Sequence, residues 1–391
     1  MQYNSRIINF PLLWRLQMRF RHTFLSALTI LMITSACSPA VVVPDVQNTA
    51  EVAMATETVS GFTINDALGR ELYFEQPPQR LVIAGRASTL LANALYLFPE
   101  AGQRIVGIEN RSQAASPILP MIDPDTSDKI FFEKNAGPEQ IAPAQPDVVI
   151  LKSYMAESLG QPLEILGINV VYLDLETPEQ FFRDIEILGQ LFGNSARAQE
   201  IQRFYQQRLD RIELDTAGIP ETQKPRVLMI QYSDSGGEVA FKVPPASWLQ
   251  TTMVELVGGT PIWTEASETG GWAIVNFEQI AAWNPDQIYV IYYPGDAKPI
   301  TENLKSDPNW QAIQAVQQDQ LYAFPGDFLS WDQPDTRWIL GLSWLFTKVQ
   351  PEVAVDLDIM QEISQFYEQL YGLDQEIIQD EVSPNLNGDL P

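Results

Sequence analysis

The sequence predicts an α/β protein of two Rossmann-like lobes, each built on a parallel-rich sheet, with a single long α-helix bridging them. Three observations predict it: short apolar segments alternate with helical patterns, one block of sequence occurs twice, and a long helical stretch separates the two copies. The length of 391 residues suits more than one domain, and an apolar fraction of 45% is ordinary for domains with a sizeable core.

Seven short apolar segments predict the strands, and helical patterns lie between them. Most of these segments are unbroken and rich in β-branched residues, which suits strands that are covered on both faces. The predicted strands span 81–84, 105–108, 148–151, 170–173, 227–230, 288–292 and 321–323, and the helical patterns include 90–97, 157–166, 248–257 and 334–347. Because strands that alternate with helices form βαβ units, the sheets should be mostly parallel.

A repeated block indicates that the two lobes are related. Residues 139–150 read EQIAPAQPDVVI, and residues 278–291 read EQIAAWNPDQIYVI. Both run Glu-Gln-Ile-Ala, three variable residues, Pro-Asp and then an apolar strand. Each unit should therefore be a short helix whose Pro-Asp turn leads into a strand, and the turn should have a structural role.

The stretch between the two copies, 177–217, predicts the helix that joins the lobes. Thr177 is a suitable N-cap, with Pro178 at the first helical position. An interruption at 193–194 precedes a second helical segment, which Ser195 can cap. A helix of about 18 residues spans about 27 Å, which is enough to reach from one lobe to the other.

The rarest residues exclude several classes of chemistry. The chain has one cysteine, Cys37, and one histidine, His22, and both belong to the N-terminal leader. Because the rest of the chain has neither residue, the sequence excludes internal disulfides, Cys/His zinc sites, Cys-His catalysis and Ser-His-Asp triads. The net charge of −26 argues against a nucleic-acid partner, because a phosphate backbone needs a basic stripe.

The N-terminus predicts a secretory signal peptide over 1–36. A short basic segment precedes the apolar stretch 24–33, which is too short to span a membrane, and small residues lead up to Cys37. This arrangement resembles a bacterial lipobox, which implies a lipid anchor on Cys37; an ordinary signal with an incidental cysteine is the alternative. The remaining segments are a flexible linker at 37–59, lobes at 60–176 and 218–372, and an acidic tail at 373–391 that is expected to fray.

A series of short elements follows in a recognisable order along most of the chain. They are 79–83, 104–108, 139–150, 167–171, 225–228, 256–259, 278–291, 307–310 and 331–334, followed by Arg337 and Trp344. Together they resemble the substrate-binding proteins of bacterial ABC importers for ferric siderophores, haem and cobalamin. The resemblance implies a ligand cleft between two lobes that close only slightly, with neither catalysis nor a covalent cofactor.

The resemblance also implies a docking site for the membrane partner. In that family a glutamate on each lobe contacts arginines of the permease, and the matching positions here are Glu139 and Glu278. The repeat independently places these carboxylates at equivalent points of the two lobes, and a symmetric permease dimer in the inner membrane offers two equivalent basic patches. Stabilisation of a helix dipole is the alternative role for each glutamate.

Ligand contacts are expected on the loops that leave the carboxyl ends of the parallel strands. The residues expected there are Arg86, Ser88, Lys152, Tyr154, Tyr232, Lys242, Trp248, Trp272, Tyr292, Tyr293, Phe328, Trp331 and Arg337. An aromatic cleft with few cations suits a bulky, planar-faced, partly anionic metal complex. Arg86 and Arg337 are the expected anion contacts, although Arg337 could equally lie on a helix surface.

The expected function is that of a monomeric, lipid-anchored, extracytoplasmic protein that delivers an iron(III)-siderophore complex to an ABC permease. Cobalamin or haem is the alternative cargo. Capture of a bare metal ion is disfavoured, because it needs imidazoles that the mature chain lacks. A secreted glycosidase is the remote alternative, since the repeat separates Glu139 and Glu278 by more than the ~5–9.5 Å that a catalytic pair needs.

Overall fold

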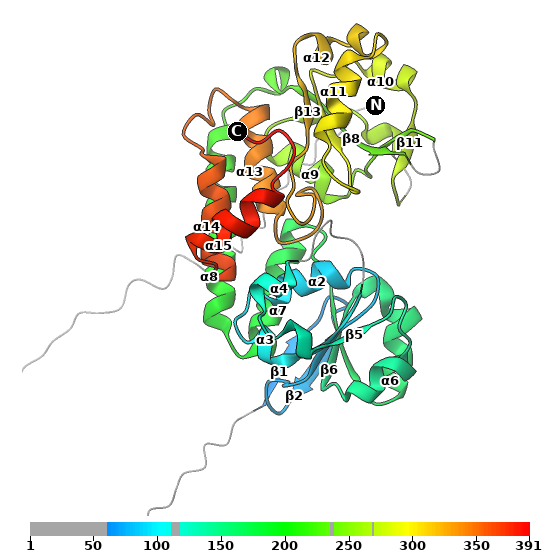
Figure 1. Ribbon diagram of the computed structural model, residues 1–391, viewed down its shortest axis with the longest axis vertical. Helices are drawn as coiled ribbons and strands as arrows, with labels where there is room; N and C mark the ends of the chain where they lie inside the picture. Colours follow the sequence, from blue (N-terminus) through cyan, green and yellow to red (C-terminus); the bar gives the residue numbers. More distant parts are fainter. Residues whose placement is uncertain (1–60, 111–117, 235–237, 268–269) are drawn as a thin grey trace, which may run out of the picture. The chain divides into compact units, whose positions relative to one another are not determined.

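The computed structural model describes residues 61–110, 118–234, 238–267 and 270–391. The first of its two large sheets has five strands, all parallel (Figure 1). Its strand order is β5-β4-β3-β6-β7. The strands are β3 (Leu81–Ile83), β4 (Ile105–Glu109), β5 (Ile130–Phe132), β6 (Val148–Lys152) and β7 (Asn169–Leu173). The winding direction reverses between β3 and β6, and α/β sheets form binding crevices at the carboxyl ends of strands beside such a point.

Helices cover both faces of this sheet, which explains why its strands are unbroken apolar runs. Leu81 and Ile83 of β3 join a core with α7 (Pro178–Phe192), while Val82 joins a second core with α6 (Gln161–Ile165). Figure 1 accordingly shows α6 and α7 on opposite sides of the sheet. The other elements of this part are the antiparallel hairpin β1 (Phe62–Asn65) and β2 (Glu71–Phe74), and the helices α2 (Ser88–Leu95), α3 (Ala101–Arg104), α4 (Leu119–Ile122) and α5 (Pro138–Ile141).

The second sheet is mixed, with strand order β11-β9-β8-β12-β13 and β10 beside β8. Strands β8, β10, β12 and β13 run parallel to one another, whereas β9 is antiparallel to both of its neighbours. The strands are β8 (Arg226–Ser233), β9 (Ala240–Val243), β10 (Thr260–Pro261), β11 (Ala273–Val275), β12 (Gln287–Ile291) and β13 (Leu321–Ala323), and the helices are α9 (Leu249–Leu256), α10 (Phe277–Trp283), α11 (Lys298–Ser306) and α12 (Gln314–Gln317). The prediction of two parallel-rich sheets is confirmed.

The repeated block makes the same contact in both sheets, which we call the latch. In the first copy, Asp147 Oδ2 accepts the backbone N–H of Arg80 at 2.9 Å, and the Arg80 guanidinium donates to a carbonyl just before the turn at 2.6 Å. In the second copy, Asp286 Oδ2 accepts the backbone N–H of Arg226 at 2.8 Å, and the Arg226 guanidinium makes the same kind of contact at 2.6 Å. Each Pro-Asp turn thus fixes the start of the neighbouring strand, which is a structural role.

The stretch between the sheets contains two helices, which are separated at the interruption that the sequence predicted at 193–194. α7 ends at Gly193, whose φ of +68° is the left-handed conformation that glycine adopts readily. α8 (Ser195–Thr216) follows, and its cap is Asn194 rather than Ser195, because the Asn194 side chain accepts a backbone N–H from the first turn. With 22 residues, α8 is about 33 Å long, and it is the long helix of the prediction.

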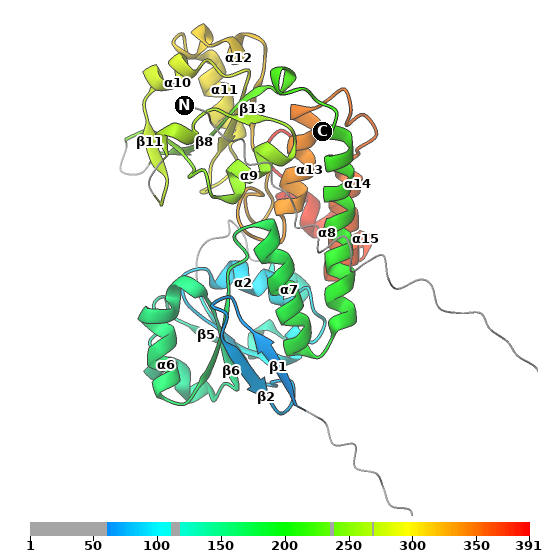
Figure 2. The same cartoon turned by 180° about the vertical axis from the view of Figure 1, so that it is seen from behind.

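α8 contacts structural elements that come before and after it in the chain. The ring centroid of its Tyr205 lies 4.3 Å from that of Phe181 in α7, and the Tyr205 hydroxyl donates to the carbonyl of Thr336. Arg208 of α8 pairs with Glu362 at 2.6 Å. Glu362 belongs to α14 (Ile359–Tyr371), and Figures 1 and 2 show α8 beside this helix. The last helices are α13 (Trp338–Val349), α14 (Ile359–Tyr371) and α15 (Gln375–Ile377).

The acidic tail, 373–391, is packed, which corrects the expectation that it frays. The Asp389 carboxylate accepts the backbone N–H of Ala323 at 2.7 Å, and the Asp389 carbonyl accepts the indole N–H of Trp344 at 3.0 Å. Val382 is fully buried. Apolar burial and these specific acceptors hold the tail in place although its side chains are mainly acidic.

The N-terminal predictions concern residues that the structure does not describe. The signal peptide at 1–36, Cys37 and the linker at 37–59 all lie outside the described ranges. Within those ranges, no helix combines the length and the apolar character needed to cross a bilayer.

Candidate functional site

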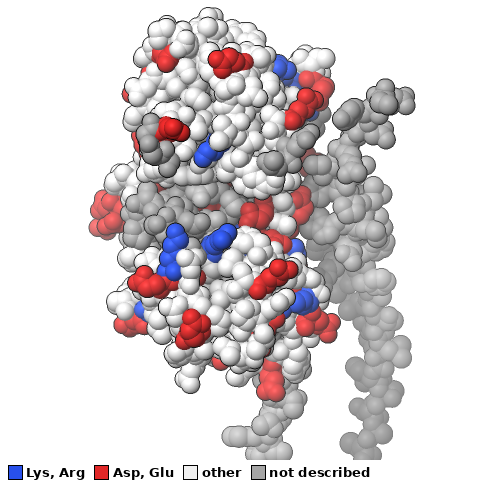
Figure 3. Space-filling view, turned by 90° about the vertical axis from the view of Figure 1, so that its right-hand side faces the viewer, with Lys and Arg blue, Asp and Glu red and all other residues white. Residues whose placement is uncertain are grey.

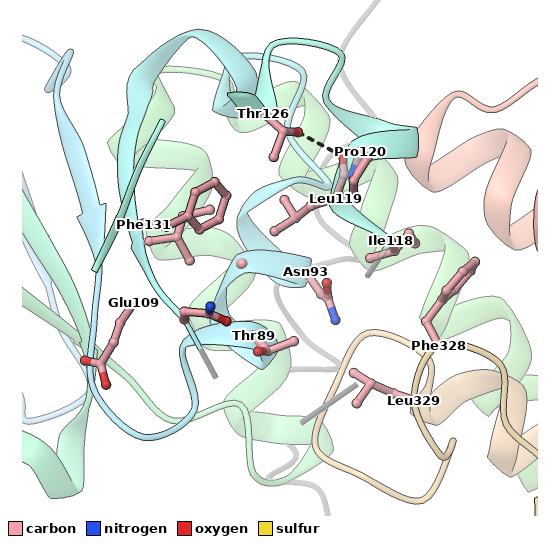
Figure 4. A pocket seen from close by; sticks show the side chains of 13 residues that line it. Thr89, Asn93, Glu109, Ile118, Leu119, Pro120, Thr126, Phe131, Phe328 and Leu329 are labelled. Atoms are coloured by element: carbon pink, nitrogen blue, oxygen red, sulfur yellow. Dashed lines mark hydrogen bonds between the residues drawn. The ribbon is translucent and has the colours of Figure 1, made fainter. Parts of the chain in front are cut away.

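A pocket of about 310 Å³ lies at the carboxyl edge of the first sheet, where β4 and β5 end (Figure 4). Its walls come from α2, from α4 and its flanking residues, from the two strands, and from the segment between β13 and α13. The lining residues are Thr89, Ala92, Asn93, Ile108, Glu109, Asn110, Ile118, Leu119, Pro120, Thr126, Phe131, Phe328 and Leu329. Two distant parts of the chain therefore build one pocket.

Glu109, the last residue of β4, organises the loops around this pocket. Its carboxylate is buried, with Oε2 accepting the backbone N–H of Gly85 at 2.7 Å and Oε1 accepting that of Asn135 at 2.9 Å. Gly85 has a φ of +83°, which disfavours any side chain there. The Ser88 hydroxyl donates to the Glu109 carbonyl at 2.7 Å. Figure 4 shows the Glu109 carboxylate directed away from Leu119, so its role is to hold the loops.

Aromatic side chains gather where β8 and β12 end in the second sheet, and we call this group the aromatic wall. The ring centroids of Trp248 and Trp272 are 5.7 Å apart and edge-to-face, and Tyr293 lies 6.2 Å from Trp272. Tyr232 and Tyr292 form a second pair at 5.8 Å. All five rings are partly exposed. The structure thus brings five of the predicted site residues into two aromatic groups, although Tyr232 lies within β8 and Trp272 directly precedes β11.

The buried carboxylate of Asp332 supports the aromatic wall. It accepts hydrogen bonds from the Tyr293 hydroxyl at 2.8 Å, the Gln250 amide at 2.9 Å and the Ser330 hydroxyl at 2.5 Å. Burial raises the pKa of the Asp332 carboxyl above its ordinary value of 3.8, although these three donors oppose the rise. Through Tyr293, the carboxylate fixes the orientation of one ring of the wall.

The raised pKa predicts a pH-dependent stability. Because the pKa of Asp332 is higher in the folded than in the unfolded chain, its favourable contribution is complete below the unfolded pKa and is lost as pH rises through the folded pKa. Relative to Asp332→Asn, the wild-type free energy of unfolding should fall with rising pH by up to about 1.4 kcal/mol per unit. Urea unfolding of both proteins across the acid and neutral range measures the difference. The exposed Asp128→Asn is the control, and a difference that does not change with pH would contradict the assignment.

Two cations that were expected to meet an anionic ligand are buried and paired instead. Lys152, at the end of β6, is 1% exposed and donates to Glu176 at 2.8 Å. Arg337 is fully buried and pairs with Asp327 at 2.9 Å and Asp335 at 2.6 Å. Since a buried charge without a partner is very costly, each cation has an acid beside it. The expectation that Lys152 and Arg337 contact the ligand is therefore corrected.

The other predicted site residues differ in exposure. Ser88 and Trp331 are fully buried, so they belong to the frame of the site rather than to its surface, which corrects their expected role. Arg86 and Tyr154 are exposed on the loops that follow β3 and β6, and Lys242 is half-buried on β9. These last three stay predictions as ligand contacts.

Sequence reasoning missed most of the pocket. Asn93, Phe131 and Leu329 line it, yet nothing in the sequence separates them from ordinary helix, strand and loop residues. The one available signal was Glu109 followed by Asn110, because a polar pair directly after an apolar strand sits where α/β proteins bind ligands.

The electrostatic character of the described residues is mainly acidic. On the face shown in Figure 3, Lys and Arg side chains are few and Asp and Glu are spread over both halves, as the net charge of −26 leads one to expect. In the parts of the chain that the structure describes, no cluster of three or more His, Cys, Asp or Glu could hold a metal ion.

Two curated proteins resemble the chain in sequence. The iron-uptake system-binding protein of Bacillus subtilis is 22% identical over 204 residues, which are 51% of this chain and 61% of that protein. The molybdate-binding protein MolA of Haemophilus influenzae is 22% identical over 258 residues, which are 60% of this chain and 69% of that protein. The chain thus spans less than two thirds of the Bacillus protein.

Solved structures match over more of the chain, and a family model matches more than half of it. A periplasmic solute binding protein from Veillonella parvula has a TM-score of 0.67 and 23% identity, covering 83% of this chain and 97% of its own. MolA bound to molybdate has a TM-score of 0.65 and 18% identity, covering 80% and 98%. The model described as periplasmic binding protein matches residues 119–328. The chain therefore belongs to the periplasmic binding protein family of ABC transporter substrate-binding proteins, which are not enzymes.

Proposed function

We propose that the protein captures an iron(III)-siderophore complex outside the cytoplasm and delivers it to an ABC permease, while a lipid on Cys37 anchors it to the membrane. Family membership supports a transport role, and the similarity to an iron-uptake binding protein supports iron as the cargo. The aromatic wall is the observation that favours a large organic chelate as the cargo. We reject the glycosidase alternative, because the members of this family are not catalytic.

The aromatic wall suits a broad ligand better than a small ion. Trp248, Trp272 and Tyr293 form one continuous group of partly exposed rings. Aromatic contacts contribute about 0.5–1.5 kcal/mol each beyond the burial of their area, and a chelate with wide organic faces can make several of them. Haem and cobalamin also present such faces and are the alternative cargoes. A tetrahedral oxyanion has no comparable face to offer.

Replacing Trp272 with alanine tests the role of the aromatic wall. Trp272 lies between Trp248 and Tyr293, so its loss should weaken binding of the ferric siderophore by about tenfold or more. Isothermal titration with a ferric siderophore, haem and cobalamin measures the effect and identifies the cargo in one series. Trp283→Ala is the matched control, because Trp283 is half-buried on α10, just before the amino end of β12. Equal affinities for wild type and Trp272→Ala would contradict the proposal.

The proposed partner is a symmetric permease dimer, and the repeat supports two contact points. Glu139 lies in the first turn of α5 and Glu278 in the first turn of α10. Both side chains are exposed. In each copy the following glutamine accepts the backbone N–H of the N-cap residue, at 2.8 Å and 3.0 Å, so the two helix starts have the same geometry. We expect the protein to act as a monomer that presents both glutamates to one permease.

A further inference from the structure

We infer that the 310 Å³ pocket beside β4 and β5 is a specificity subsite that takes an uncharged apolar group carried by the cargo. The inference rests on the proposed function and names the kind of chelate: one with a neutral aliphatic or aryl arm. The aromatic wall would contact the body of the chelate, and the pocket would take the arm. The two regions lie on different sheets and supply separate contacts.

The walls of the pocket favour an apolar occupant. Hydrocarbon surface comes from Ile118, Leu119, Phe131, Phe328 and Leu329, and Phe131 is 46% exposed. Covering exposed apolar surface is favourable, and each buried methylene changes an affinity by about fourfold. Figure 4 shows these side chains arranged around one space.

Three polar side chains of the pocket already have hydrogen-bond partners within the protein. Both carboxylate oxygens of Glu109 accept backbone N–H groups. The Asn93 amide donates to Asp335 at 2.5 Å, and the Thr126 hydroxyl donates to the carbonyls of Leu119 and Asp123. A polar arm would lose its hydration without gaining equivalent partners from these groups, which costs free energy.

The charge of the pocket disfavours anions. Among the described residues that line it, none is Lys or Arg, and Glu109 is acidic. An oxyanion entering this space would lose water and meet no cation among these described lining residues. The pocket should therefore reject molybdate, although a protein with this fold binds that ion.

The pocket is held open by buried contacts between distant segments. Asn93 of α2 bonds to Asp335, and its carbonyl accepts the Tyr371 hydroxyl at 3.0 Å. Phe328 and Leu329 directly follow Asp327, which Arg337 holds at 2.9 Å. A preformed pocket binds without a cost of ordering its walls. Since an apolar cavity of about 150 Å³ is sufficient for benzene, this space accommodates an arm of that size or larger.

The test compares ligands with and without an arm on the full chain. The probes are a ferric trihydroxamate, the same chelate with a neutral phenyl substituent, 2-naphthol, and molybdate. Wild type should bind the phenyl chelate about tenfold or more tightly than the plain chelate, should bind 2-naphthol, and should not bind molybdate in titration calorimetry. Ala92→Phe, which adds bulk on the α2 wall, should abolish the preference for the arm.

A second pair of variants covers the case in which Ala92→Phe fails to fold. Phe131→Ser removes an exposed pocket wall. Tyr73→Ser is the control, because it removes an aromatic ring that is also exposed, at 65%, on β2 and away from the pocket. Only Phe131→Ser should reduce the preference for the phenyl arm. Binding of 2-naphthol without binding of any chelate would refute the proposed function and support the pocket. Equal affinities for both chelates, unchanged in Phe131→Ser, would overturn the pocket while leaving the proposed function intact.

Discussion

Replacing Arg337 with methionine should lower the free energy of unfolding by about 3–5 kcal/mol, the largest effect that we expect from any single substitution outside the hydrophobic core. Arg337 is fully buried and lies within 2.9 Å of Asp327 and 2.6 Å of Asp335. Methionine fills a similar volume but leaves both carboxylates without a cation in a low-dielectric surrounding. The loss of stability comes from burying two carboxylates without a partner, rather than from losing one favourable ion pair.

Urea unfolding followed by tryptophan fluorescence measures this loss. A triple variant that adds Asp327→Asn and Asp335→Asn to Arg337→Met should recover much of the stability, because no uncompensated charge is then buried. Arg211→Ala, at a partly exposed position of α8 with a long 3.7 Å ion pair, is the control and should change stability by less than about 1 kcal/mol. Two results would contradict this prediction: a loss of stability as small as that of the control, or no recovered stability in the triple variant. Either would show that Arg337, Asp327 and Asp335 do not form a charged cluster.

The double variant Glu139→Ala with Glu278→Ala should abolish uptake while cargo affinity stays unchanged. Both carboxylates are exposed and lie at equivalent positions of the repeat, on α5 and α10, rather than in the pocket or the aromatic wall. Charges at the rim of an interface steer and orient a complex more than they tighten it. Without them, the loaded protein should fail to align with a symmetric permease.

Uptake of radiolabelled ferric siderophore by cells that depend on the variant measures the effect, and calorimetry of the purified protein checks the affinity. Glu157→Ala with Glu302→Ala is the matched control, since these exposed glutamates also lie one on each half of the chain, outside the repeat. Each single variant should retain part of the uptake. Weaker cargo binding in the double variant would place these carboxylates in the binding site, and normal uptake would assign them only to their helix dipoles.

Much of the fold could be predicted because its strands are buried on both faces. Leu81, Val82 and Ile83 pack into two different cores, so the strand appears in the sequence as an unbroken apolar run. The interruption at Gly193 and Asn194 could also be predicted, since these residue types commonly end one helix and begin another. The cap of α8 was misplaced by one position, because both Asn194 and Ser195 can serve as N-caps.

Site residues could be predicted only where the order of strands and loops is enough to say where a residue lies. The carboxyl-end rule put both Trp272 and Tyr293 among the candidate contacts, and their ring centroids lie 6.2 Å apart, although Trp272 directly precedes β11 instead of following a strand. The rule did not distinguish Arg337, whose burial depends on Asp327 and Asp335 meeting it in three dimensions. It could not find Phe131 either, since an apolar side chain that lines a cavity and one that fills a core look alike in a sequence.

The latch has a consequence for the history of the molecule. Asp147 with Arg80 and Asp286 with Arg226 repeat one hydrogen-bonding arrangement in two sheets. Such a recurrence is the expected trace of a gene duplication that fused two copies of a half-length ancestor. The pocket draws on both halves of the chain, because Phe328 and Leu329 come from the half with the second copy of the latch and the other lining residues from the half with the first.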